Sequence, residues 1–250
     1  AAAHVEVLLR ELAFVAEGMA GTEATFGDST DKGIALAVDE VNAKGGVNGR
    51  TLEVKTYDNQ GKPEESAVAA TRLIVQDKVA VLLGEVASTR SLAMAPIADA
   101  NQVPMITPSS TNQKVTKDGA RTRPFVFRVC FIDPFQGTVM AKFARENLKL
   151  SKVAVLRDVG SDYSVGLADF FLTKFKELGG TIVDDQSYKD TDSDFKAQLK
   201  AIKAKNPDGI YDLTLDISDG GGGRDIGNGS TVAGIEIVQL VFQTSGVVDF

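Results

Sequence analysis

Segments with strand-like and helix-like hydrophobic patterns alternate along most of this 250-residue chain, and this alternation constrains the fold more than any other feature. Between residues 51 and 211, short runs rich in Val, Ile and Leu are followed by amphipathic segments of helical period. Such alternation favours βαβ units, in which crossover helices join parallel strands. We therefore expect an α/β fold with mostly parallel sheets.

The individual elements follow from local signals. Helices are expected where apolar residues recur every three or four positions, and strands where short apolar runs end at turn residues. The predicted strands span residues 51–57, 79–83, 103–106, 125–129, 152–157, 181–183 and 208–213. The predicted helices lie around 34–41, at 63–77, at 88–100, from 133 onward, at 164–178 and around 195–202. Asp28, Ser29 and Thr30 are cap candidates for the first helix, and Ser164 is the predicted N-cap of the fifth. The helix at 88–100 is expected to be interrupted at Pro96.

The length of the chain permits one large domain or two small ones. A second βα series begins at Asp133, so we predict an N-terminal lobe over residues 1–130 and a partial second lobe over 131–217. Residues 218–230 contain six glycines and are predicted to be a linker. The remaining residues, 231–250, begin with an apolar, strand-like run.

Composition excludes several classes of function. The chain has 27 basic and 34 acidic residues, a net charge of -7, and no basic run that would favour nucleic acid. No apolar stretch reaches the roughly 18 residues that a membrane helix needs, so the chain is not expected to be membrane-embedded. The first residues lack the pattern of a signal peptide, which indicates a mature chain.

Residues for catalysis or metal binding are scarce. His4 is the only histidine and Cys130 the only cysteine, which excludes a histidine-based triad, an HExxH zinc site and a thiolate cluster. Residues 162–166 lack the first glycine of a nucleophile elbow, and the aspartates of 190–194 lack the glycine and glutamate of an EF-hand loop. We predict no enzyme activity, no cofactor and no metal site.

Hydroxyl side chains gather at two predicted strand-to-helix turns. Ser88 follows the strand that ends at Leu83, and Ser109, Ser110 and Thr111 follow the next strand. The carboxyl ends of parallel strands face the ligand crevice of an open sheet, and helix N-termini there favour anions. A small carboxylate would be held well by these turns. The alternative is that the hydroxyls only cap their own helices.

Several segments carry a family resemblance, in order along the chain. They are 24–27 (ATFG), 33–50 (GIALAVDEVNAKGGVNGR), 76–79 (QDKV), 95–97 (API), 103–112 (VPMITPSSTN), 129–137 (VCFIDPFQG), 158–167 (DVGSDYSVGL) and 203–208 (KAKNPD). Over residues 24–211 the sequence resembles the branched-chain amino-acid-binding proteins of bacterial ABC transporters. Beyond Tyr211, the family's tyrosine-rich loop, its acidic ammonium partner and about a third of its length are missing.

The resemblance implies a type I periplasmic-binding-protein fold with two Rossmann-like or flavodoxin-like lobes, a hinge and a ligand between the lobes. The second lobe is expected to be incomplete. In similar proteins, hydroxyls and backbone N–H groups of the first lobe hold the ligand's α-carboxylate and ammonium groups, and aromatic side chains cover it. The ligand-binding residues implied for this chain are Ser88, Ser109, Ser110, Thr111, Phe26 and Tyr163.

These observations lead to one preferred function and two alternatives. The preferred one is the solute-binding component of an ABC transporter, periplasmic or extracellular, which captures a small amino acid or related carboxylate, branched-chain amino acids being favoured. Its partners would be the membrane subunits of the transporter. A ligand-sensing or regulatory domain of the same fold is the first alternative. The second, a flavodoxin-like enzyme, would need turnover or a cofactor that no motif here encodes.

Overall fold

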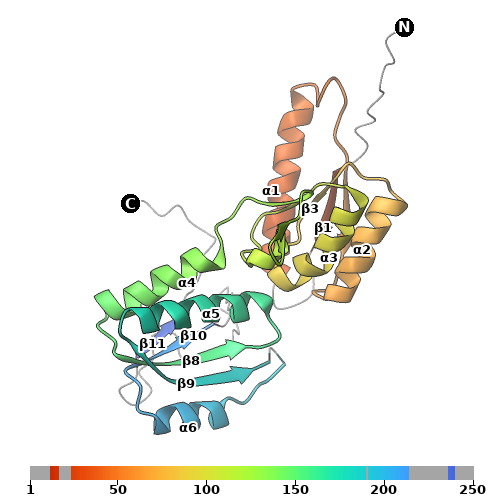
Figure 1. The fold of residues 1–250 in the computed structure, drawn as a ribbon. Helices are drawn as coiled ribbons and strands as arrows, with labels where there is room; N and C mark the ends of the chain where they lie inside the picture. Colours follow the sequence, from red (N-terminus) through yellow and green to blue (C-terminus); the bar gives the residue numbers. More distant parts are fainter. Residues whose placement is uncertain (1–11, 17–23, 190, 214–235, 240–250) are drawn as a thin grey trace. The chain divides into compact units, whose positions relative to one another are not determined.

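The computed structural model describes residues 12–16, 24–189, 191–213 and 236–239, and it describes side-chain burial for residues 26–189 and 191–213. The chain divides into two compact units, one over Ala1–Cys130 and one over Phe131–Phe250. Each unit has its own parallel sheet and its own helices (Figure 1). The α/β architecture expected from the alternating pattern is confirmed in both.

The first unit is built on a five-stranded sheet. Its strands run in the order β2-β1-β3-β4-β7, and every neighbouring pair is parallel. The strands are β1 (Leu12–Ala16), β2 (Val54–Asp58), β3 (Val81–Leu83), β4 (Met105–Thr107) and β7 (Val126–Arg128). The remaining elements are α1 (Ala24–Ala43), α2 (Pro63–Val75), α3 (Ser88–Asn101), the short η1 (Gln113–Val115) and an antiparallel pair, β5 (Lys117–Asp118) and β6 (Arg121–Thr122).

Helices α2 and α3 supply most of the apolar core of this unit. Pro63 opens α2, where its missing N–H costs nothing, and Glu64 and Glu65 complement the positive end of the helix dipole. The predicted interruption of α3 at Pro96 is wrong, because the helix continues through it. The fully buried core side chains on both sides of the proline hold the backbone in place; they include Met94, Ala95 and Ala98.

The second unit contains a four-stranded parallel sheet in the order β11-β10-β8-β9. Helices α4 and α5 lie on one face of this sheet and α6 on the other (Figure 1). The strands are β8 (Lys152–Asp158), β9 (Thr181–Tyr188), β10 (Gly209–Asp212) and β11 (Glu236–Gln239); the helices are α4 (Asp133–Lys142), the π-helical turn η2 (Phe143–Asn147), α5 (Asp162–Glu177) and α6 (Lys196–Ala204).

Strand β9 is longer than the three residues predicted. It pairs with the whole of β8, and a bulge shifts the register between Val153 and Ala154. The bulge breaks the simple alternation that marks a strand in sequence. Residues 184–187, in the C-terminal half of β9, are polar because β9 is an edge strand of the sheet. This half therefore lacks the apolar pattern from which strands were predicted.

Two predicted helix starts are wrong. Helix α1 begins at Ala24, so the cap candidates Asp28, Ser29 and Thr30 lie inside it, where Asp28 pairs with Lys32. Ser164 is not the N-cap of α5. Ser161 is, and its hydroxyl accepts a hydrogen bond from the Ser164 N–H.

Helices α4 and α5 approach each other closely at Gly137. A Cβ at this position would lie 2.8 Å from the Cβ of Phe170 and 2.9 Å from the backbone nitrogen of Phe171. Only glycine permits this spacing, because the nearest obstacles include backbone atoms of α5 that cannot rotate away. The glycine thus sets the distance between the two helices that cover the sheet.

The predicted C-terminal segments are described only in part. Residues 218–230, the predicted linker, lie outside the described residues. Within the apolar run that follows, Glu236–Gln239 form β11 and pair in parallel with β10. Among the helices in the described part of the chain, none is long and apolar enough to cross a membrane.

Candidate functional site

Two loops of the first unit bring the predicted hydroxyls to one edge of the sheet. Residues 84–87 join β3 to α3, and residues 108–112 follow β4. Strands β3 and β4 are hydrogen-bonded neighbours, with Leu83 paired to Ile106. The carboxyl ends of the two strands therefore place both loops side by side, as the hydroxyl pattern predicted.

The backbone carbonyl of Glu85 ties the two loops together. It accepts hydrogen bonds from the hydroxyls of Ser91 (2.9 Å), Thr107 (2.6 Å) and Ser110 (3.1 Å). The hydroxyls of Ser91 and Ser110 also lie within hydrogen-bond distance of each other, at 2.7 Å. All four residues are buried. The loop after β4 is thereby fixed against the start of α3.

The carboxylate of Glu85 is fully buried and anchors the start of α3 from the other side. One oxygen accepts hydrogen bonds from Asn59 Nδ2 (2.9 Å) and Arg90 Nε (3.1 Å). The second oxygen accepts the backbone N–H of Ala87 at 2.7 Å. A buried charge is tolerated because it is paired and hydrogen-bonded. This group was not predicted from the sequence, although a charged residue two positions after a buried strand is a usable signal.

Two of the predicted site hydroxyls are engaged within the protein. Ser110 is buried and bonds the carbonyl of Glu85, as described above. Ser109 is exposed, and its hydroxyl donates to the carbonyl of Val86 at 2.7 Å. Both side chains therefore join the two loops, through bonds that span 23 and 25 residues of sequence, so they are not the caps of their own helices that the alternative predicted.

The other two predicted hydroxyls keep hydrogen-bonding capacity. Ser88 opens α3 and is buried, and its oxygen accepts the N–H of Asn112 at 3.2 Å, a bond that leaves the hydroxyl proton available. Thr111 is only 6% exposed. Within the described part of the chain, its hydroxyl has no hydrogen-bond partner. A buried hydroxyl without a partner costs free energy, and an external hydrogen-bonding group would offset that cost.

Helix α3 adds electrostatic attraction for an anion. Its N-cap residue, Ala87, has no side chain that caps the helix, and the first turn contains no acidic residue. The first N–H groups of a helix have no acceptor within it, and its dipole places partial positive charge there. The start of α3, with Ser88 and the neighbouring Thr111 loop, is thus suited to a small carboxylate.

The two predicted aromatic residues lie in different units. Phe26 is in the first turn of α1 in the first unit and is half-buried. Tyr163 is in the first turn of α5 in the second unit, and its hydroxyl accepts a hydrogen bond from Gln136 Nε2 at 2.8 Å. Burial raises the pKa of Tyr163 to about 12, and the nearby Asp133 carboxylate adds to this.

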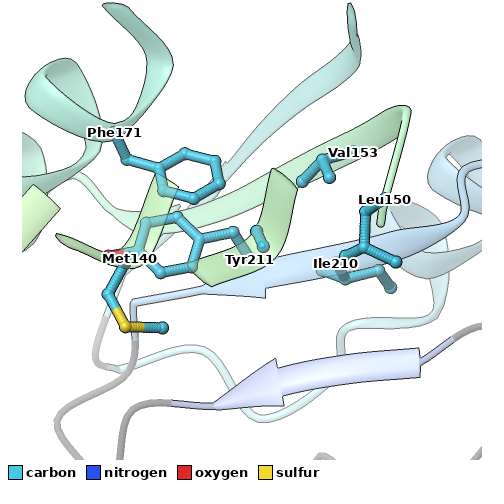
Figure 2. A pocket seen from close by; sticks show the side chains of 7 residues that line it. Met140, Leu150, Val153, Phe171, Ile210 and Tyr211 are labelled. Carbon is cyan, nitrogen blue, oxygen red and sulfur yellow. The ribbon is translucent and has the colours of Figure 1, made fainter. Parts of the chain in front are cut away.

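Tyr211, on β10, belongs to the same buried group of the second unit. Burial raises its pKa well above the ordinary value, and the phenol of Tyr163 and the carboxylate of Asp133 act in the same direction. The ring stacks on Phe171, with ring centroids 3.8 Å apart. Figure 2 shows the two rings close together in a small recess that has no room for a water molecule. The recess is lined by Met140, Ala144, Leu150, Val153, Phe171, Ile210 and Tyr211. The lining is apolar core, so the recess does not suit a charged ligand.

Two aspartates of the acidic segment 190–194 are described, Asp192 and Asp194. Asp192 accepts the N–H of Lys189 and Asp194 the N–H of Lys196, so both carboxylates bond their own loop. Asp190 lies outside the described residues. Elsewhere in the described ranges, no three His, Cys, Asp or Glu side chains form a group that would hold a metal ion.

Comparison with known proteins places this arrangement in a family. The family model described as periplasmic binding protein matches residues 15–217. The Leu/Ile/Val-binding protein BraC3 of Rhizobium johnstonii is 32% identical over 209 residues, which are 84% of this chain and 54% of that protein. The chain thus spans about half the length of this curated relative.

Two solved structures support the same family assignment. The crystal structure of a leucine binding protein LivK from Thermotoga maritima is 46% identical, with a TM-score of 0.75 over 81% of this chain and 55% of that one. The branched-chain amino acid transporter substrate binding protein LivJ from Streptococcus pneumoniae, in complex with isoleucine, is 34% identical, with a TM-score of 0.72 over 81% and 56% of the two chains. The chain belongs to the periplasmic binding protein family and is similar to its branched-chain amino-acid-binding members.

Proposed function

We propose that this protein is the solute-binding component of an ABC transporter and captures a small amino acid, with branched-chain amino acids preferred. The observation that carries the proposal is the buried Thr111 hydroxyl, which has no partner in the described residues and lies one residue from Asn112, whose N–H bonds Ser88 at the start of α3. The names of similar proteins point to leucine, isoleucine and valine.

In this proposal the ligand's carboxylate binds at the start of α3. The Thr111 hydroxyl and the Ser88 hydroxyl proton would donate to it, and the positive end of the helix dipole would stabilise its charge. Tyr163, in the second unit, would cover the ligand from the other lobe.

Delivery to a transporter follows from the family rather than from any contact described here. The partners would be the membrane subunits of an ABC transporter, and the protein would work in the periplasm or outside the cell. No chemical step is required, because capture and release of an unchanged solute suffice.

A thermal-shift screen against the twenty amino acids and small carboxylates tests the proposal. A ligand that binds only the folded state stabilises it by about 2.7 kcal/mol at one hundred times its Kd, which corresponds to a few degrees in Tm. We expect selective stabilisation by leucine, isoleucine or valine, and a smaller shift with leucinamide at the same concentration. A cooperative melt that no amino acid or carboxylate shifts would contradict the proposal.

A further inference from the structure

The side chain of Arg128 contacts the loop that carries Thr111. It is the last residue of β7, and its partner in the neighbouring strand is Thr107, where that loop begins. One terminal nitrogen donates to the carbonyl of Ser110 at 2.7 Å. The other donates to the carbonyl of Asn112 and to the hydroxyl of Thr116, both at 2.9 Å. The guanidinium thus spans the loop on both sides of Thr111.

These contacts set the direction of the Thr111 amide. The carbonyl of Ser110 and the N–H of Thr111 belong to one peptide group, and the cis peptide bond of the described chain lies elsewhere, at Gly84–Glu85. In a trans peptide the carbonyl and the N–H point in opposite directions. Because Arg128 holds the Ser110 carbonyl, the Thr111 N–H is turned away from the guanidinium.

Only arginine can make this set of contacts. Its planar fork holds several N–H donors in a fixed geometry, whereas lysine has one compact ammonium group on a flexible stem. The two carbonyls and the hydroxyl need donors in different directions, and the loop's serine hydroxyls are already committed elsewhere. Ser110, for example, uses its hydroxyl on Glu85 and Ser91.

We infer that Arg128 is a positioning residue for ligand binding: it holds the Thr111 peptide in the orientation that receives the ligand's carboxylate. It does not touch the ligand in this assignment. The inference rests on the proposed function, since it concerns the same carboxylate site. The new prediction is that a substitution at Arg128, outside the site, weakens the binding of ligands that carry a carboxylate and leaves the binding of ligands without one nearly unchanged.

The test compares L-leucine with L-leucinamide, which lacks the carboxylate, by calorimetric titration of the full chain. In Arg128→Lys we expect leucine binding to weaken about 10- to 100-fold, the range for loss of a hydrogen bond to a charged group, and leucinamide binding to change less than about 3-fold. Arg121→Met is the matched control. Arg121 lies on β6, is 60% exposed and pairs with Asp99, so leucine binding should stay unchanged.

The outcomes separate the two proposals. If the wild-type chain binds neither compound, the proposed function fails. If it binds leucine and Arg128→Lys binds it equally well, the inference about Arg128 is wrong. Equal weakening for leucine and leucinamide would also overturn it, since that indicates a general loosening of the unit. If the lysine variant does not fold, Thr116→Val serves in its place, because it removes one acceptor of the guanidinium. We then expect leucine binding, but not leucinamide binding, to weaken about 3-fold.

Discussion

Replacing Thr111 by valine separates ligand binding from folding at a single side chain. Valine has nearly the shape of threonine, so the buried volume is kept while the hydroxyl is lost. That hydroxyl is almost entirely buried and has no hydrogen-bond partner within the residues that the structure describes. The change therefore removes an uncompensated polar group from the protein and a donor from the ligand.

The two effects have opposite signs. Burying a hydroxyl without a partner costs about 1–3 kcal/mol, so the unliganded Thr111→Val protein should be as stable as the wild type or more stable by about 1 kcal/mol. A hydrogen bond to a charged carboxylate contributes about 1.5–3 kcal/mol, so leucine binding should weaken about 10- to 100-fold.

Ser110→Ala is the matched comparison, because Ser110 lies in the same loop and its hydroxyl is engaged. It bonds the Glu85 carbonyl and the Ser91 hydroxyl, so its loss should lower the free energy of unfolding by about 1–2 kcal/mol. Urea unfolding without ligand and thermal shift with leucine measure the two effects on both variants.

Two results would refute this reasoning. A loss of more than about 1 kcal/mol in unliganded Thr111→Val would mean that the hydroxyl stabilises the fold and is not reserved for a ligand. Unchanged leucine binding in a stable Thr111→Val protein would mean that Thr111 does not contact the carboxylate.

Three further predictions concern stability. Glu85→Gln removes the buried negative charge beside Arg90 and should lower the free energy of unfolding by about 3 kcal/mol in urea denaturation. Gly137→Ala should lower it by about 1–3 kcal/mol, since the new Cβ meets backbone of α5, whereas Gly33→Ala has open space in α1 and should raise it by about 0.5–1 kcal/mol. The folded state keeps the Tyr163 proton up to a pKa of about 12, against 10.0 ordinarily, so stability should fall by about 1 kcal/mol as pH rises to about 11.

Each of these has its own control. Glu64→Gln, in the exposed first turn of α2, should cost less than about 1 kcal/mol, and an equal cost for Glu85→Gln would contradict the buried-pair argument. If thermal melts showed that both glycine substitutions change the stability in the same direction, the steric explanation for Gly137 would be wrong. In the alkaline series Tyr163→Phe should lose less stability than the wild type, and identical slopes would exclude Tyr163 as the source.

Much of the fold was predictable because it is encoded locally. Alternating hydrophobic periods predicted the parallel sheets and most helices, and Pro63 with Glu64 marked the start of α2. The turns after β3 and β4 were predictable as one cluster of hydroxyls at the edge of the sheet, because the carboxyl ends of neighbouring parallel strands meet there. Two errors lie where tertiary contacts override local signals: the core carries α3 through Pro96, and pairing with the whole of β8 extends β9 into polar sequence.

The sequence by itself determined the fold class and the edge of the sheet that holds the candidate site, because hydrophobic period and turn chemistry act over a few residues, and its motifs carried the resemblance to the family. Only the tertiary structure decided which hydroxyls are spent within the protein and which keep capacity for a ligand. Ser110 and Thr111 are adjacent and chemically alike, yet Ser110 meets the carbonyl of Glu85, 25 residues away in sequence, and within the described residues Thr111 meets no partner. The same holds for Arg128, whose carbonyl acceptors no side-chain pattern reveals. Such pairings depend on which segments the fold brings together, and a local pattern carries no information about that.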